Sequence, residues 1–245
     1  MFLIEPTPTQ ADLHFRLGSI PVRVHPYFWL TSLLLRGMGS PADVLTWIVA
    51  VFVSILVHEL GHALLQVYFG GRTRIVLYGM GGLAIGERVN YSPVRQVLIS
   101  LAGPVAGFLF AGLIAVVLML AGVALRVDFP FVIPAPMSSH QLRVFLFDLF
   151  QVNILWGLLN LLPIYPLDGG QVARELFTLG MPPQRGIVAS LWVSTITAAG
   201  VAVYFFTQQG GGLSLGSLWP VLMFGLLAYS SFQTLQAYQN SRGAR

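Results

Sequence analysis

Long apolar stretches constrain this sequence more than any other feature. At least four of them approach or exceed about 18 residues, the length that an α-helix needs to cross a bilayer core of roughly 30 Å. Of the 245 residues, 56% are hydrophobic and 9% are charged, far fewer charges than a soluble globular domain carries. A helix satisfies its own backbone hydrogen bonds in lipid. The sequence therefore predicts an all-α polytopic membrane protein.

The apolar pattern predicts a bundle of six transmembrane helices, at residues 26–36, 42–69, 94–125, 142–162, 187–207 and 213–238. The first span is short and aromatic. We expect residues 1–245 to form a single transmembrane domain, with a polar N-terminal segment at 1–25 and a short tail at 239–245. The N-terminal segment holds Glu5 and Asp12 and has no apolar core, so no cleavable signal peptide is expected.

Arginine positions predict the orientation in the membrane. All 13 basic residues are arginines, and they lie scattered in loops without a basic run, so no nucleic-acid partner is expected. Six spans place both termini on one side, and on the other side lie only Arg36, Arg126 and Arg143. Because inner loops carry the excess of basic residues, the termini are expected in the cytoplasm. An all-arginine, compact chain fits the inner membrane of a prokaryotic cell.

Residues 72–90 differ from the spans on either side. They combine β-branched and aromatic residues with several glycines, which is typical of a small β-hairpin or re-entrant segment. Non-helical backbone at membrane depth is tolerated only where protein or a wet cavity satisfies it. The segment is therefore a candidate for lining a site, with Gly81 and Gly82 as possible substrate contacts.

The strongest chemical signal is the sequence His58-Glu59-Leu-Gly-His62 in the second span. Positions i and i+4 of a helix face the same way, so both imidazoles can reach one zinc ion. Glu59 is placed to act on the attacking water rather than on the metal. Ionisable groups in an apolar span are costly and usually functional, which makes a purely structural role improbable.

A catalytic zinc site needs a third protein ligand. The remaining histidines lie in the N-terminal segment or an outer loop, which leaves Asp148 and Asp168 as candidates. Asp168 follows the fourth span, in the sequence NLLPIYPLDGG, at the inner side where the second span delivers its histidines. Asp148 lies nearer the outer face. Absence of cysteine excludes thiolate ligands and cysteine-protease chemistry.

The pair of motifs HELGH and NLLPIYPLDGG resembles the site-2 protease family of intramembrane zinc metalloproteases, in a compact form without a PDZ or CBS domain. Weaker similarities are GSIPVRVHPYF, the GMGGLA segment and SLAGPVAG. The resemblance implies that His58, His62 and Asp168 bind one Zn²⁺ per chain and that Glu59 is the catalytic base. It also implies that Asn160 positions the substrate, a membrane-anchored protein cleaved within or near the bilayer.

Two other classes of function are weighed against this hypothesis. A metal-ion transporter or channel would spread polar residues through the membrane depth, whereas here they gather at one level. A catalytically silent membrane adaptor would not need all of the predicted catalytic and ligand residues. Glycines in the third span, at Gly103-Pro104 and from Gly107 to Gly112, are interpreted as sites of close helix packing.

Overall fold

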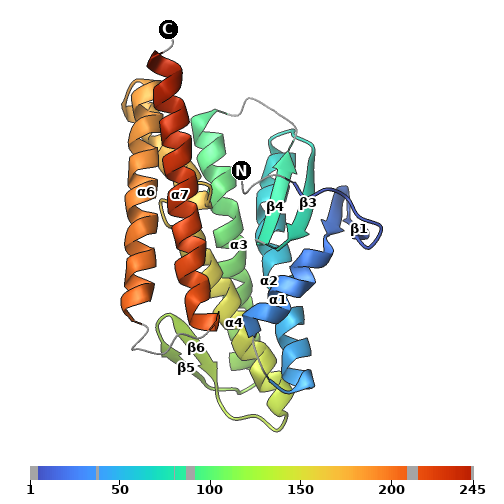
Figure 1. Ribbon diagram of the computed structural model, residues 1–245. Helices are drawn as coiled ribbons and strands as arrows, with labels where there is room; N and C mark the ends of the chain where they lie inside the picture. The colour runs from blue at the N-terminus through green and yellow to red at the C-terminus, as the bar shows by residue number, and fades with distance from the viewer. Residues whose placement is uncertain (1–4, 37–38, 80, 87–91, 209–214, 244–245) are drawn as a thin grey trace. The chain divides into compact units, whose positions relative to one another are not determined.

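A computed structural model describes residues 5–36, 39–79, 81–86, 92–208 and 215–243, and most of them are helical (Figure 1). The chain forms two compact units. The sheet unit comprises residues 5–90 and 102–159, and the C-terminal unit comprises residues 91–101 and 160–245. Helix α3 (Pro93–Leu120) contributes residues to both.

A four-stranded sheet is the core of the sheet unit. Its strands are β1 (Leu13–Leu17), β2 (Ile20–Val24), β3 (Thr73–Tyr78) and β4 (Gly81–Gly86), in the order β1-β2-β3-β4. The outer pairs are antiparallel, whereas β2 and β3 are parallel. Residues 72–90 therefore include two strands, while residue 80 and residues 87–90 lie outside the described part.

Helix α2 (Pro41–Tyr68) is the long helix against which β3 and β4 pack (Figure 1). Ser40 caps its start, because the Ser40 hydroxyl accepts the Asp43 amide at 3.2 Å and Pro41 occupies the first turn. Gly70, with φ 86°, ends it, and the Gly71 amide donates to the Gln66 carbonyl. Helix α2 thus ends one residue before residue 69, the predicted end of the second span.

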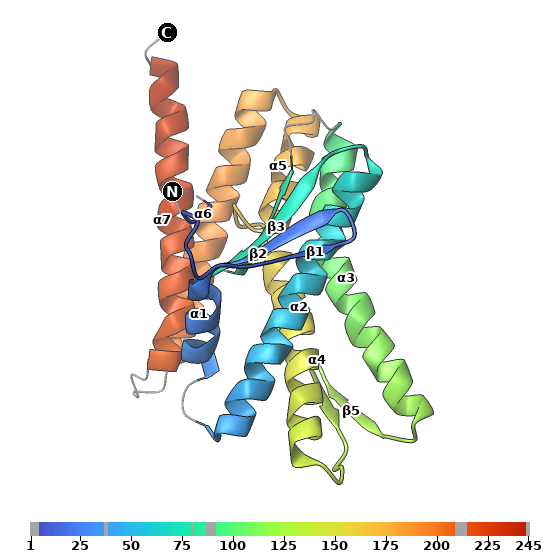
Figure 2. The same cartoon turned by 90° about the vertical axis from the view of Figure 1, so that its right-hand side faces the viewer.

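Helix α1 (Pro26–Arg36) has 11 residues. At 1.5 Å per residue it is about 16 Å long, roughly half of a bilayer core. It joins the sheet to the start of α2, and the indole of Trp47 donates to the Ser32 carbonyl at 2.9 Å. Figure 2 shows α1 running beside one half of α2 while the sheet lies beside the other half.

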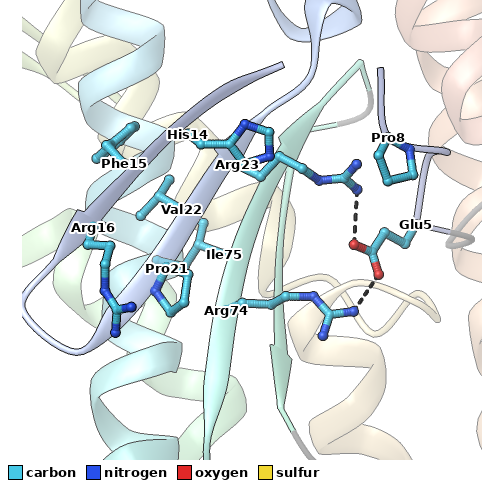
Figure 3. Close-up of a pocket in the computed structure, with 10 residues that line it drawn as sticks. All are labelled: Glu5, Pro8, His14, Phe15, Arg16, Pro21, Val22, Arg23, Arg74 and Ile75. Atoms are coloured by element: carbon cyan, nitrogen blue, oxygen red, sulfur yellow. Dashed lines mark hydrogen bonds and ion pairs between the residues drawn. The ribbon is translucent and has the colours of Figure 1, made fainter. Parts of the chain in front are cut away.

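The N-terminal segment is tied to the sheet by ion pairs. Figure 3 shows the Glu5 carboxylate between two guanidinium groups, 2.9 Å from Arg23 and 2.6 Å from Arg74. Arg23 also contacts Asp12 at 3.1 Å. Glu5, Arg23 and Arg74 line an open hollow on the sheet together with other residues of β1 to β3. The described part of the predicted polar segment 1–25, from Glu5 onward, contains two strands.

The rest of the sheet unit is a second apolar cluster built on α3 and α4 (His140–Asn160). Strands β5 (Leu125–Asp128) and β6 (Phe131–Pro134) form a small hairpin between these helices. Phe150 of α4 is 1% exposed and packs with Ala111 and Leu118 of α3. Helix α3 ends at Leu120, five residues before the predicted end, because Gly122 with φ 75° stops it.

The C-terminal unit contains α5 (Asp168–Gly180), α6 (Pro183–Thr207) and α7 (Leu215–Gly243). Helices α6 and α7 pack along each other, and α5 packs on α6. Helix α7 continues to Gly243, so the predicted tail at 239–245 is helical over its described part. Helix α5 is amphipathic.

Five helices are long and apolar enough to cross a membrane in the part of the chain described above: α2, α3, α4, α6 and α7. Their surfaces carry many exposed leucines, such as Leu109 and Leu113 of α3, which are 69% and 60% exposed. The remaining predicted span corresponds to the short α1. The prediction of six membrane helices is therefore not confirmed, and the difference lies in the first span.

Candidate metal and catalytic site

His58 and His62 project from one face of α2, one helical turn apart. Their Nε2 atoms lie 3.2 Å apart, and the side chains are buried. Two nitrogens that bind one zinc ion at about 2.0–2.1 Å and a tetrahedral angle lie about 3.3–3.4 Å apart. The spacing of the two imidazoles therefore fits two ligands of a single ion, and their nitrogen donors suit zinc.

Glu59 is buried on the same helix and lies directly under strand β4. It is 5% exposed. A Cβ atom added to Gly82 would overlap the Glu59 side chain and lie 2.6 Å from its Oε1 atom. The β4 backbone at Gly82 thus packs against the glutamate and limits its rotamers.

Tyr78 is a neighbour of Glu59 that sequence reasoning missed. It ends β3, where it pairs with Gly81. Burial raises the pKa of the Tyr78 phenol to about 12, and the negative charge of Glu59 adds to the effect. The phenol is therefore a neutral hydrogen-bond donor beside the candidate base at any physiological pH. No sequence motif marks this tyrosine, because its place depends on how β3 packs against α2.

Asp168 belongs to the C-terminal unit and is the first residue of α5, where the helix dipole stabilises a carboxylate. It is 8% exposed. Gly169 and Gly170 follow it, and a Cβ atom at either would overlap backbone atoms of residues 161–165. The two glycines thus let the first turn of α5 pack on the preceding loop, which holds the aspartate in one place.

Two serines from other helices hold that loop. Ser194 of α6 accepts the Tyr165 amide at 2.7 Å, and Ser231 of α7 donates to the Tyr165 carbonyl at 3.0 Å. The two hydroxyls lie 2.8 Å apart. Tyr165 stands three residues before Asp168, so this serine pair positions the backbone that carries the candidate ligand.

The structure gives Asp148 a different role from that of a ligand. Its carboxylate lies 3.3 Å from Arg36 at the end of α1, which ties α4 to α1. Asn153 of α4 donates to the Ser54 hydroxyl at 2.8 Å and thereby links α4 to α2. Both groups thus make contacts between helices of the sheet unit.

The sheet unit brings together His58, Glu59 and His62, with Gly82 and Tyr78 beside the glutamate. Asp168 and Asn160 lie in the C-terminal unit, where Asn160 ends α4 and is 8% exposed.

Two family models match adjacent parts of the chain. The Peptidase family M50 model matches residues 123–203, and the Peptidase M50B-like model matches residues 32–132. A zinc metalloprotease of Methanocaldococcus jannaschii is 26% identical over 67% of this chain and 44% of its own length. Stage IV sporulation protein FB of Bacillus subtilis is 30% identical over 68% of this chain and 51% of its own length. The chain thus spans about half the length of these relatives.

Among solved structures, the site-2 protease from Methanocaldococcus jannaschii has the same fold. The TM-score is 0.59 at 19% sequence identity, over 91% of this chain and 95% of that one. The predicted membership of the site-2 protease family is confirmed by the family models and the relatives. The helical fold with a small sheet, the family models and the relatives agree: this chain belongs to the M50 peptidases, the family of the site-2 proteases.

Proposed function

We propose that this chain is an intramembrane zinc metalloprotease that hydrolyses peptide bonds of membrane-anchored proteins. The observation that carries the proposal is the imidazole pair on α2, with Nε2 atoms 3.2 Å apart and the carboxylate of Glu59 beside it. This helix has the length and composition of a membrane span. Buried ionisable groups on such a helix are costly and therefore indicate function.

Asp168 is proposed as the third ligand. It is a buried carboxylate like the two buried imidazoles, and two nitrogens plus one oxygen leave one position of a tetrahedral zinc site open for water or substrate. A bound zinc ion would polarise the scissile carbonyl and lower the pKa of the attacking water to about 7. Asp168 is held by the tight packing of α5 on its preceding loop, which favours a preorganised ligand.

Glu59 acts as the general base in this proposal. Its carboxylate accepts a proton from the attacking water and passes it to the leaving amine. The Tyr78 phenol, neutral beside it, keeps a hydrogen-bond donor near the reacting groups. Asn160 is proposed to help orient the substrate carbonyl. No serine or cysteine nucleophile is required.

The β4 edge is proposed to present the substrate. A transmembrane helix protects its own amides, so the substrate must unwind before it is cut. Strand β4 lies at the end of the four-stranded sheet, and Gly82 packs on Glu59. An extended substrate segment that pairs with β4 at Gly81 and Gly82 would therefore run past the catalytic base.

Proline substitutions at Leu83 and Ala84 test this pairing. Amide groups of neighbouring residues in an antiparallel strand point to opposite sides. One proline therefore removes an amide that donates a hydrogen bond to β3, and the other removes an amide that points to the outer edge of β4. The edge-facing variant should keep its fold and zinc and lose cleavage. Unchanged turnover in that variant would show that substrate does not pair with β4.

The orientation in the membrane is likewise a proposal. We infer that both termini face the cytoplasm of a prokaryotic cell. In this arrangement the short α1 and the four-stranded sheet together replace a full first membrane span. The distribution of arginines supports this orientation. Cysteine labelling from each side of the membrane, at single cysteines introduced into the cysteine-free chain, tests it directly.

The central experiment separates metal binding from catalysis. Glu59→Gln should keep about one zinc per chain and lose cleavage of a membrane-anchored substrate by about 10²–10⁴-fold, which is the contribution of general-base catalysis. Asp168→Asn should weaken zinc binding as well as cleavage. Full cleavage by Glu59→Gln would exclude Glu59 as the general base. Wild-type zinc affinity in Asp168→Asn would exclude Asp168 as a ligand.

The same variants distinguish the rival functions. A metal transporter would move zinc across proteoliposomes, and Glu59→Gln would not be expected to trap a peptide substrate. A silent adaptor would bind membrane-anchored clients without cleaving them in the wild type. Capture of uncut substrates on Glu59→Gln in native membranes, with cut products in the wild type, is the result that the protease proposal predicts.

A further inference from the structure

Gly103 of α3 faces the two candidate histidine ligands. A Cβ atom added to Gly103 would overlap the His62 Nε2 atom and lie 2.8 Å from the His58 Nε2 atom. Gly112, nine residues further along the same helix, has open space at the corresponding position, with nothing within 4 Å. A side chain at residue 103 would therefore meet the candidate ligands, whereas a side chain at residue 112 has room.

The close approach of α2 and α3 explains this contact. A Cβ atom added to Gly61, between the two histidines, would overlap the Ala102 carbonyl oxygen and lie 2.7 Å from the Ala106 Cβ atom. The helices therefore touch backbone to backbone, with Gly61 against α3 and Gly103 against the imidazoles. Small residues are what such close crossings require.

An ion held by both histidines must share the space in front of their Nε2 atoms. Zinc lies about 2.0–2.1 Å from each ligand nitrogen. A methyl group at residue 103 would lie within 3 Å of both nitrogens, as the added Cβ atom shows. A carbon atom at that distance occupies the coordination sphere of the ion, so the methyl group and the ion exclude each other.

We infer that Gly103 decides whether this chain can take up its metal: its missing side chain is the space that the ion and its fourth ligand occupy. The inference rests on the proposed zinc site and adds a positioning residue to it. A packing glycine alone, which is the interpretation from sequence, would matter for the fold and not for the metal.

The two roles predict different effects for Gly103→Ala. The atoms that the new methyl group would meet are tips of imidazole side chains, which can turn away by changing rotamer. Alanine is also a better helix former than glycine. The variant should therefore keep its helices and lose the arrangement in which both Nε2 atoms point at one ion.

The experiment compares Gly103→Ala with Gly112→Ala in the full chain, purified in lipid nanodiscs. Zinc affinity is measured by competition with a chelator, and thermal stability is measured with zinc and with EDTA. Wild type and Gly112→Ala should bind about one zinc and be stabilised by it. Gly103→Ala should bind zinc at least about 100-fold more weakly, since even indirect changes around a metal ligand cost about 10–100-fold.

Zinc affinity in Gly103→Ala equal to that of the wild type overturns the inference and leaves the proposed protease intact. A wild-type chain that binds no zinc overturns both. If Gly103→Ala does not fold, it is combined with His62→Ala, which removes the overlapping ring. Recovery of the stability of His62→Ala alone supports the placement of the methyl group at the ligand, and failure to recover overturns it.

Discussion

The backbone before Asp168 depends on two serine hydroxyls, and removing one of them should loosen it measurably. All three hydrogen bonds are satisfied when Ser231 donates to the Tyr165 carbonyl and Ser194 donates to Ser231 while it accepts the Tyr165 amide. Ser194→Ala removes two of these bonds and takes away the hydroxyl that accepts the part-buried Tyr165 amide. Ser231→Ala removes the bond to the carbonyl and the acceptor of the Ser194 hydroxyl.

The expected loss follows from the burial of the serines, which are 1% and 0% exposed at residues 194 and 231. A buried donor left unpaired costs about 1–3 kcal/mol, whereas hydrogen bonds between membrane helices contribute about 0.6 kcal/mol on average and at most about 1.7. We therefore expect about 1–2 kcal/mol for Ser194→Ala. The double variant should lose less than the sum by about 1 kcal/mol, because the two hydroxyls share one network.

The free energy of unfolding in mixed micelles, measured by denaturant titration, gives these values. Zinc affinity should fall by about tenfold in Ser194→Ala, because the displaced loop carries Asp168. Ser190→Ala is the matched control, since Ser190 is buried on the same helix and its hydroxyl donates to the Ile187 carbonyl of its own turn. A loss in Ser194→Ala no larger than that of the control would refute the reasoning.

Two further predictions concern the surroundings of Glu59. Gly82→Ala places a methyl group on the Glu59 side chain, so kcat should fall by at least about tenfold with zinc content unchanged; wild-type kcat would contradict the contact. The pKa of the Tyr78 phenol is about 12 in the folded protein, against about 10 for an unfolded tyrosine, and this difference sets how the stability changes with pH. The unfolded phenol loses its proton first, so the stability of the fold should drop between about pH 10 and 12 and be unaffected below. Ultraviolet titration of wild type against Tyr78→Phe checks this, and a difference that titrates near pH 10 would contradict it.

The local chemistry of the sequence determined much of the fold and half of the candidate site. Gly70 and Gly71 directly follow the predicted second span, and they stop α2 because helix capping acts within a few residues. The period of the helix alone places His58 and His62 on one face with Glu59 beside them. Hydrophobic length identified α2, α3, α4, α6 and α7, since each is apolar along its own course. These features need no contact from distant parts of the chain.

Tertiary structure decided what depends on partners remote in sequence. Strands β2 and β3 are parallel neighbours although about 50 residues separate Val22 from its partner Ile75, and no local pattern encodes that pairing. Their sheet packs beside one half of α2, and the short α1 lies beside the other half. Gly103 shows the same limit. From the sequence, a glycine in a helix is interpreted as a site of close helix packing, and only the structure shows which side chains face it. Local propensity acts through neighbouring residues, whereas the space left by a missing side chain exists only once two helices meet.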